Sequence, residues 1–490
     1  MSEIREQISS GIKWNFIGQI SRQGINFILS IFLARLLAPS EFGLIAMLSI
    51  FIGLAEAFIH SGLGAGLVHR NDVTEKDYAT VFYFNITASA VFYLLLFFSA
   101  PFIANIYYEP SLVKITYWLS ISFIINSFGM VPNYILVKNL EFKKVNLITL
   151  LSVIASAPVA IVMAYLGAGV YSLVAQTIIY SVTNCIFLFY FTRWKPRAPF
   201  NWISFKKLFR FGSNILISYI LEKIFKNFDS LFIGKMFSSS ILGYFTRAKS
   251  TRDLSIDNTS SILTNIVFPI FSKIEDNKEL FRIHLKFFKL VAYVNFPIMV
   301  GLLLVAKPMF IILFSSKWLP SVFYFKILCI AGIVIPLIVI LQQTILSRGR
   351  SDLVLKVDII NKALYVLSIV AGMYFGMTTV LYLIVLSAII TFLISMIMTK
   401  MLLKISLYKY IIGLIPSALL TLSMFAIVFS ISHFINFYSC YIELFVLCGI
   451  GIIVYTTLSL IFKIEEFLYL KNQVIVKLQF LKIRRKKQIP

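Results

Sequence analysis

The chain has 490 residues, of which 59% are hydrophobic and only 13% are charged. Soluble domains carry about a quarter charged residues, so this composition excludes a soluble globular protein and indicates an integral membrane protein. A formal net charge of +24 would suggest nucleic-acid binding in a soluble protein; in a membrane protein it indicates anchoring cations at the cytoplasmic face, and no nucleic-acid partner is predicted.

Apolar segments long enough to cross a bilayer, which takes about 20 residues, recur along the whole chain. Polar or Gly/Pro breaks separate about fourteen predicted spans, and the predicted fold class is therefore an all-α membrane protein with about 14 transmembrane helices. In chain order the spans are 14–37, 43–67, 79–105, 112–137, 146–166, 169–191, 208–236, 241–271, 289–314, 321–346, 354–375, 379–399, 410–433 and 440–462.

Lysine and arginine are concentrated in every second connection between these spans. Such connections face the cytoplasm, and their alternation places both termini there. The connections on the other side are short, so no extracytoplasmic soluble domain is expected. The basic connections are 138–144, 193–210, 273–289, 348–356 and 400–409, and the tail ends in KIRRKK.

A short sequence motif occurs twice in the chain, 200 residues apart. LARLLAPSEFGL (33–44) and IGKMFSSSILGY (233–244) share a basic residue, a serine and a glycine at equal offsets. Similar matches continue along the chain and predict two pseudo-symmetric six-span lobes with a site between them. The predicted organisation is an N-lobe at 1–200, a C-lobe at 205–405, spans 13 and 14 at 410–465 and a basic cytoplasmic tail at 466–490.

Ionisable residues inside the predicted spans form the candidate site. Each costs about 2.5–3.5 kcal/mol at the centre of a bilayer helix, so these groups must face water or one another. Cavity cations and polar groups are predicted at Arg22, Asn26, Lys226, Arg247, Lys249 and Arg252, and coupling or pairing groups at Glu56, His60, Glu222, Asp229, Asp253 and Asp257.

Two interpretations of these charges are open. They could be internal ion pairs that lock helices, such as Glu222–Lys226, Lys249–Asp253 or Asp358–Lys362, each at spacing 4. Alternatively they line a hydrated path for an anionic cargo, because guanidinium groups bind phosphate through two parallel hydrogen bonds. The ionisable residues are concentrated on spans 1, 2, 7 and 8, which are matched positions in the two lobes, and this favours the hydrated path. His60 could titrate near neutral pH. No catalytic residue, metal site or nucleotide-binding glycine loop is predicted.

The run FLARLLAPSEFGLIAMLSIFIGLAEAFIHSGLGAGLVHRNDVTEKDYATVFYFN, residues 32–85, resembles the N-terminal signature of the polysaccharide flippases. These form the polysaccharide transporter family of the multidrug/oligosaccharidyl-lipid/polysaccharide exporter superfamily. The similarity is strongest with the branch that exports lipopolysaccharide and colanic-acid type repeat units.

The resemblance implies fourteen helices, with two six-helix lobes in a V around a central cavity and two extra C-terminal helices beside a groove for a lipid tail. It implies that the chain is not an enzyme. The implied cargo is an undecaprenyl-pyrophosphate-type lipid-linked oligosaccharide, carried to the outer leaflet of the bacterial inner (plasma) membrane by alternating access. It further implies a coupling proton or sodium ion in place of a cofactor, and glycan polymerase machinery as a partner.

Three other functions remain open at this point. A cation-coupled multidrug antiporter should favour acidic cavity residues, whereas these spans carry both signs of charge. A peptidoglycan lipid-precursor flippase of the same superfamily fits the same pattern. A membrane glycan polymerase or ligase should need a sizeable extracytoplasmic loop with catalytic groups, and the predicted connections are too short to hold one.

Overall fold

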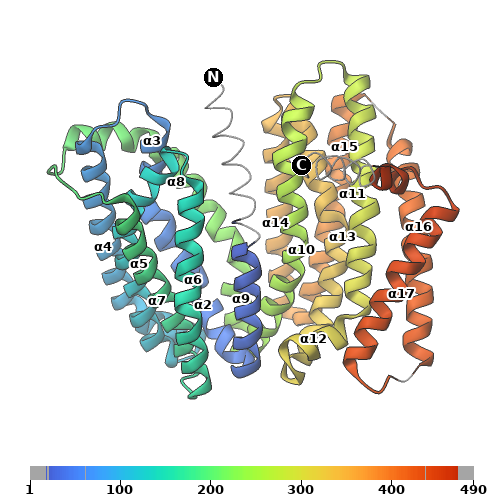
Figure 1. Ribbon diagram of the computed structural model, residues 1–490, viewed down its shortest axis with the longest axis horizontal. Helices are drawn as coiled ribbons and strands as arrows, with labels where there is room; N and C mark the ends of the chain where they lie inside the picture. The colour runs from blue at the N-terminus through green and yellow to red at the C-terminus, as the bar shows by residue number, and fades with distance from the viewer. Residues whose placement is uncertain (1–17, 19–20, 61, 405, 436, 473–490) are drawn as a thin grey trace, which may run out of the picture. The chain divides into compact units, whose positions relative to one another are not determined.

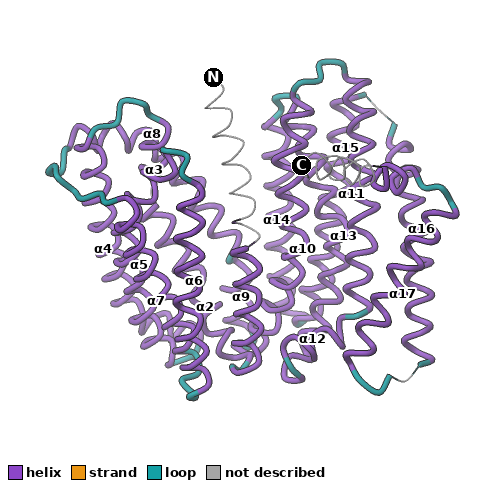
Figure 2. Tube along the Cα trace, viewed as in Figure 1, coloured by secondary structure: helices purple, strands orange, loops and turns teal. Residues whose placement is uncertain are grey.

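Helices make up all the regular secondary structure in the part of the chain that the structure describes (Figures 1 and 2). The computed structural model describes residue 18 and residues 21–60, 62–404, 406–435 and 437–472. The predicted all-α class is thereby confirmed.

Contacts divide the chain into two compact units, unit 1 (Met1–Thr246) and unit 2 (Arg247–Pro490), with the boundary inside α10. The lobes predicted from the repeat, divided at residues 200–205, stay a prediction.

Unit 1 holds a helical stretch at 21–36, α2 (Pro39–His60), α3 (Leu63–His69), α4 (Glu75–Tyr107), α5 (Ser111–Lys138), α6 (Phe142–Tyr165), α7 (Tyr171–Thr192), α8 (Trp202–Lys226), α9 (Phe228–Met236) and the start of α10 (Ser239–Ser272). Unit 2 holds the rest of α10, α11 (Asn277–Leu304), α12 (Ala306–Phe314), the short 3₁₀ helix η1 (Ser316–Trp318), α13 (Leu319–Ser347), α14 (Ser351–Phe375), α15 (Met377–Leu403), α16 (Leu407–Phe434), α17 (Cys440–Ile461) and a helical segment at 465–472.

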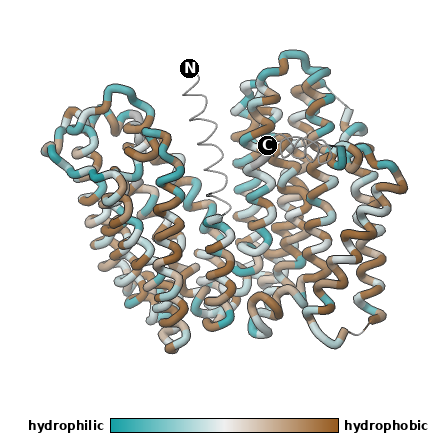
Figure 3. Tube along the Cα trace, in the orientation of Figure 1, coloured by the Kyte–Doolittle hydropathy of each residue, from teal (hydrophilic) through white to brown (hydrophobic). Residues whose placement is uncertain are grey.

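Ten candidate membrane spans, counted among the described residues, make this a multi-pass membrane protein. Hydrophobic residues run along the middle of the long helices, and hydrophilic residues gather at the loops (Figure 3). Four predicted spans fall outside this set: 14–37, which is only partly described, 208–236, 241–271 and 354–375. These four segments carry most of the predicted site residues. Charged residues lower the hydropathy of 208–236 and 241–271. The figure of fourteen spans stays a prediction.

The core of each unit is built from helix pairs. In unit 1, α5 packs against both α4 and α7, and α6 packs against α7; the three helices α4, α5 and α7 lie side by side in Figure 1. In unit 2, α13 packs against α11 and α15. The unit 2 core centres on Phe288 and Tyr410, both fully buried, whose ring centroids lie 5.1 Å apart in an edge-to-face arrangement that is typical of favourable aromatic pairs.

Three predicted spans are each divided into two helices. The 43–67 segment breaks between α2 and α3 at Gly62, whose φ of 63° is left-handed and therefore suits glycine. The 208–236 segment breaks at Asn227, whose side chain donates to the Lys223 carbonyl over 2.9 Å. The 289–314 segment breaks at Val305, between α11 and α12. Hydropathy does not show the breaks at Gly62 and Val305 because both halves of each of those segments are apolar.

The two copies of the repeated motif meet inside unit 1. The start of α2 crosses the start of α10 so closely that a Cβ on Gly43 would collide with the backbone oxygen of Ser239. Reciprocally, a Cβ on Gly243 would collide with the backbone oxygen of Pro39. Both glycines and both carbonyls are related by the 200-residue offset, so the repeated glycines permit a symmetric backbone contact.

Candidate functional site

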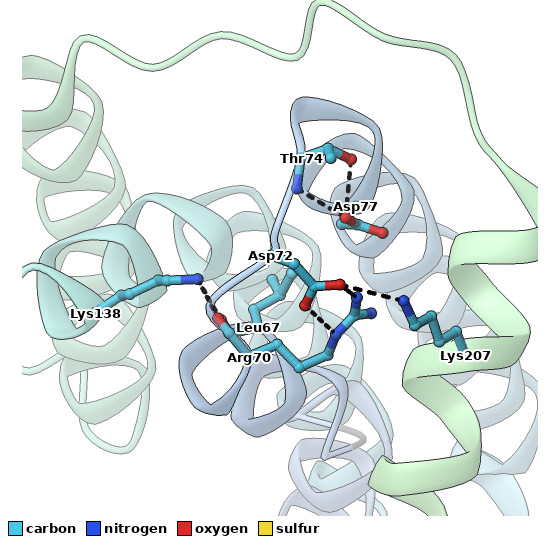
Figure 4. Close-up of polar contacts among 7 residues, drawn as sticks. All are labelled: Leu67, Arg70, Asp72, Thr74, Asp77, Lys138 and Lys207. Carbon is cyan, nitrogen blue, oxygen red and sulfur yellow. Dashed lines mark hydrogen bonds and ion pairs between the residues drawn. The ribbon is translucent and has the colours of Figure 1, made fainter.

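Helix α3 and its loop to α4, which belong to the signature segment, form a cluster of hydrogen bonds in unit 1, called the clasp below (Figure 4). Lys138, at the end of α5, donates to the backbone carbonyls of Leu67 and Arg70 over 3.0 and 2.6 Å. Asp72 accepts from Arg70 (Nε, 3.0 Å) and from Lys207 of α8 (3.3 Å). The hydrogen bond from Arg70 lowers the pKa of the exposed Asp72 carboxyl to about 2, so this contact persists at neutral pH and is lost only as the pH falls towards 2.

The start of α4 completes the clasp. Thr74 and Asp77 form a capping box in which Asp77 accepts from the Thr74 amide over 2.8 Å (Figure 4). Glu75 accepts from the indole of Trp194 over 3.2 Å and thereby holds the linker between α7 and α8. The signature therefore has a structural role: it fixes α4, α5, α8 and the linker to one another.

Replacing Lys138 with methionine should lower the free energy of unfolding by about 1.5–3 kcal/mol, the usual value of a hydrogen bond to a charged group. Two backbone carbonyls at the end of α3 would lose their partner. Thermal unfolding in detergent measures the effect. Lys76→Met is the matched control, because Lys76 is exposed on the neighbouring α4. Equal melting temperatures for the two variants would show that the clasp does not stabilise unit 1.

A polar pocket of about 260 Å³ lies inside unit 1. It brings together two predicted site residues, Arg22 and Glu56, from separate helices. The remaining polar lining, which sequence analysis missed, consists of Asn126, Asn133, Thr149, Tyr180 and Asn184. Asn126 and Asn133 lie seven residues apart on α5, a spacing that puts both on one helix face, and this periodicity is the signal that could have identified them.

Glu56 is the pocket residue with a cationic partner on α8. Its carboxylate lies 3.0 Å from Lys223 Nζ, and the two side chains are 41% and 33% exposed. A pair this exposed is worth about 0.2–1 kcal/mol. The carboxylate, the guanidinium of Arg22 and several amide oxygens make the pocket a site that can hold either a cation or part of an anionic, hydroxyl-rich molecule.

The other predicted residues of unit 1 lie in different surroundings. Asn26, Glu222 and Lys226 are exposed, whereas Asp229 is 2% exposed and accepts from the amide of Ser230 at the start of α9. The side chain of His60 lies outside the described residues. None of the four described side chains is placed in the polar pocket, and the roles of all five residues stay predictions.

In unit 2 the predicted cations of α10 are packed against neighbouring helices. Arg252 is 7% exposed and donates through Nε to Asp253 over 2.8 Å. Arg247 is equally buried, and its guanidinium carbon lies 5.0 Å from the Phe314 ring centroid and 5.1 Å from that of Trp318, a cation–π geometry. Such contacts hold a desolvated guanidinium in place.

The two other α10 residues, Lys249 and Asp257, differ in exposure. Lys249 Nζ lies 5.9 Å from the Tyr365 ring centroid of α14, and Asp257 is exposed. Asp358 of α14 accepts from Gln342 of α13 over 2.8 Å. Polar groups thus connect α10, α13 and α14 within unit 2, but nothing in the structure assigns them to a cargo.

An apolar groove of about 380 Å³ lies between α11, α16 and α17. Among its lining residues are Ile298, Val428, Leu447 and Ile452. The last two predicted spans, now α16 and α17, therefore border an apolar groove, as the family resemblance implies.

Comparison with known proteins gives concordant results. A family described as "Polysaccharide biosynthesis protein" matches residues 32–323, more than half of the chain. The teichuronic acid biosynthesis protein TuaB of Bacillus subtilis is 28% identical over 88% of this chain and 90% of its own length. The lipopolysaccharide biosynthesis protein WzxC of Escherichia coli is 23% identical over 75% of this chain and 76% of its own length.

A solved structure of the lipid II flippase MurJ, in an inward closed conformation, has the same fold. It superimposes with a TM-score of 0.73 at 16% identity, and the match covers 91% of this chain and 98% of that chain. At this identity the likeness concerns the fold alone. The family match and the fold together place this multi-pass membrane protein in the polysaccharide biosynthesis protein family, which confirms the resemblance predicted from residues 32–85.

Proposed function

We propose that the protein flips polyprenyl-pyrophosphate-linked oligosaccharide repeat units from the cytoplasmic to the outer leaflet of the bacterial plasma membrane by alternating access. The repeat units would serve a surface polysaccharide of the lipopolysaccharide O-antigen, exopolysaccharide or teichuronic-acid type. It is a transporter and not an enzyme in this proposal. The observation that carries it is the fold of a lipid flippase over 91% of a chain that belongs to a polysaccharide biosynthesis family.

The chemistry of the two units supports an amphipathic cargo. Unit 1 offers a polar pocket with a guanidinium and several amides, which suits a sugar–pyrophosphate head. Unit 2 offers an apolar groove beside α16 and α17, which suits a prenyl chain. A multidrug antiporter would not be expected to resemble polysaccharide biosynthesis proteins in sequence. An organic-cation cargo would also give no reason for an arginine in the pocket. A peptidoglycan precursor has the same head chemistry, but TuaB and WzxC are named for other glycans.

Coupling and topology extend the proposal. Glu56 is the group we assign to a coupling proton or sodium ion, because it is the carboxylate that lines the polar pocket and because oxygen ligands suit hard cations. Both termini lie in the cytoplasm, as the alternation of basic connections indicates. The proposed partners are the lipid bilayer and glycan polymerase machinery.

Deletion of the gene tests the function. Cells without the protein should lose surface polysaccharide and accumulate lipid-linked repeat units, measured by extraction and mass spectrometry. The wild-type gene should restore export. The proposal assigns Arg22 of the polar pocket and Arg252, one of the cations predicted from the sequence, to the cargo. The Arg22→Ala/Arg252→Ala variant should insert normally but fail to export, since each lost charge-assisted contact is worth about 1.5–3 kcal/mol, or about ten- to hundredfold in rate.

Lys195→Ala/Arg197→Ala is the control, because it removes one lysine and one arginine that are exposed on the linker between α7 and α8. Normal surface polysaccharide in the deletion strain would refute the function itself. Normal export by Arg22→Ala/Arg252→Ala, with the deletion phenotype intact, would refute only the assigned cations.

A further inference from the structure

A second, larger cavity in unit 2 has no part in the proposed transport site. This basic groove has a volume of about 1350 Å³. Its lining comes from α11 and its N-cap (ten residues between 276 and 290), from residues 403, 404, 406 and 409 of the α15–α16 connection, and from residues 465, 466 and 469 after α17. It belongs entirely to unit 2.

The basic groove lies at one membrane boundary. It is formed where α11 and α16 begin and where α15 and α17 end, and all four helices are candidate membrane spans. Antiparallel spans bring such ends to the same face of the bilayer. The connections involved, 273–289 and 400–409, are among the lysine-rich ones, so this face is the cytoplasmic one by the positive-inside rule.

Cations outnumber carboxylates in the basic groove by two to one. Asp276 is committed to capping α11, where it accepts from the amide of Glu279 over 2.9 Å. Glu465 is 88% exposed in its side chain and lies 3.9 Å from Lys289, which is a weak pair. In the described part of the chain this is the only ion pair that the lining cations make. Those cations are Lys278, Arg282, Lys286, Lys289, Lys404 and Lys409.

Three of the cations share one face of α11. Arg282, Lys286 and Lys289 follow one another at spacings of 4 and 3, which aligns them along a single helical stripe. Lys286 Nζ lies 4.1 Å from the ring centroid of Tyr469, so the aromatic ring holds the ammonium group in the groove. Two long cationic side chains one turn apart can chelate a phosphate group.

The walls between these charges are apolar, with Leu285, Leu290 and Leu403 in the lining. Charge alone would suit any soluble anion, but an apolar wall at a bilayer boundary also suits an acyl chain. The sequence beyond residue 472, which ends KIRRKKQIP, carries the same sign of charge as the groove, so its charge does not complement the lining. The occupant is therefore anionic and amphipathic.

We propose that the basic groove binds an anionic glycerophospholipid of the cytoplasmic leaflet. Its phosphodiester headgroup is bound between Arg282 and Lys286, and its acyl chains lie along Leu285 and Leu290. Clusters of basic residues at the cytoplasmic ends of membrane helices recognise such headgroups. The bound lipid bridges α11 and the segment 465–472, and so stabilises unit 2 without being transported.

Native mass spectrometry of the full-length protein tests the site. Protein released from mixed micelles should retain dioleoyl phosphatidylglycerol in preference to dioleoyl phosphatidylcholine. Arg282→Gln/Lys286→Gln should weaken retention of phosphatidylglycerol about 30-fold, because each of the two cations near the membrane surface strengthens binding of an anionic lipid about fivefold. Lys195→Gln/Arg197→Gln, with the same loss of charge elsewhere, should bind as the wild type does.

Two further arms settle the remaining outcomes. Arg282→Lys/Lys286→Arg keeps both charges and should retain phosphatidylglycerol; loss of binding there, or normal binding by Arg282→Gln/Lys286→Gln, would overturn the proposal. Inorganic phosphate and glycerol 3-phosphate at millimolar concentration should raise the melting temperature much less than the lipid does. Equal protection by these soluble anions would show an anion site and refute the lipid.

Discussion

Replacing Gly43 with alanine is expected to destabilise unit 1, whereas most glycine-to-alanine changes in helices are stabilising. The new methyl group would collide with the backbone oxygen of Ser239, and a backbone atom cannot rotate away as a side chain can. Overpacking of this kind costs about 1–3 kcal/mol or more, so α2 and α10 would have to move apart. Gly243→Ala should have a similar effect through Pro39.

Gly449→Ala in α17 supplies a control with the opposite sign. A Cβ at Gly449 meets nothing within 4 Å, so alanine there should stabilise the helix by about 0.5–1 kcal/mol. The melting temperature of each purified variant measures the contrast. The double variant Gly43→Ala/Gly243→Ala should cost less than the two single changes together, because one separation of the helices relieves both collisions. A melting temperature for Gly43→Ala at or above that of the wild type would refute the close crossing.

The repeat shows which features of the fold the sequence can predict and which it cannot. Equal offsets identify Gly43 and Gly243 as equivalent positions, and they predict two related halves. They do not show that the equivalent positions touch, because contact depends on the crossing of α2 and α10. The same limit applies to helix breaks: Val305 divides α11 from α12 although neither hydropathy nor a glycine or proline at that position indicates it.

The candidate site was partly predictable for a related reason. Charges inside a span stand out because their burial in lipid is costly, which is how Arg22 and Glu56 were identified. Amides such as Asn126 and Asn184 cost less and stand out less, although they line the same pocket.

The ion-pair partners of the charged residues could not be predicted from the sequence either. Helical spacing suggested pairs four residues apart. In the structure, Asp253 accepts from Arg252, its immediate neighbour in the chain. Glu56 pairs with Lys223 of a different helix, 167 residues away. Spacing arguments treat one helix at a time, so they cannot identify partners that tertiary packing supplies.

Exchanging the charges of Glu56 and Lys223 should separate a structural ion pair from a working carboxylate. In the native protein the Glu56 carboxylate and Lys223 Nζ lie 3.0 Å apart. Glu56→Lys/Lys223→Glu keeps one cation and one anion at these two positions but moves the carboxylate from α2 to α8. Because the pair is partly exposed, its stability contribution is about 0.2–1 kcal/mol, and the exchanged protein should melt close to the wild type.

Export by the exchanged protein should nevertheless fall by about tenfold or more, because a coupling cation or the cargo loses a charge-assisted contact worth about 1.5–3 kcal/mol. Surface polysaccharide in the deletion strain measures this. Glu56→Gln should lose export to a similar extent, whereas Lys223→Gln, which leaves the carboxylate in the pocket, should retain more. If the exchanged protein exports normally, the pair is only a lock between α2 and α8. The coupling role of Glu56 would then be wrong, even with the flippase function intact.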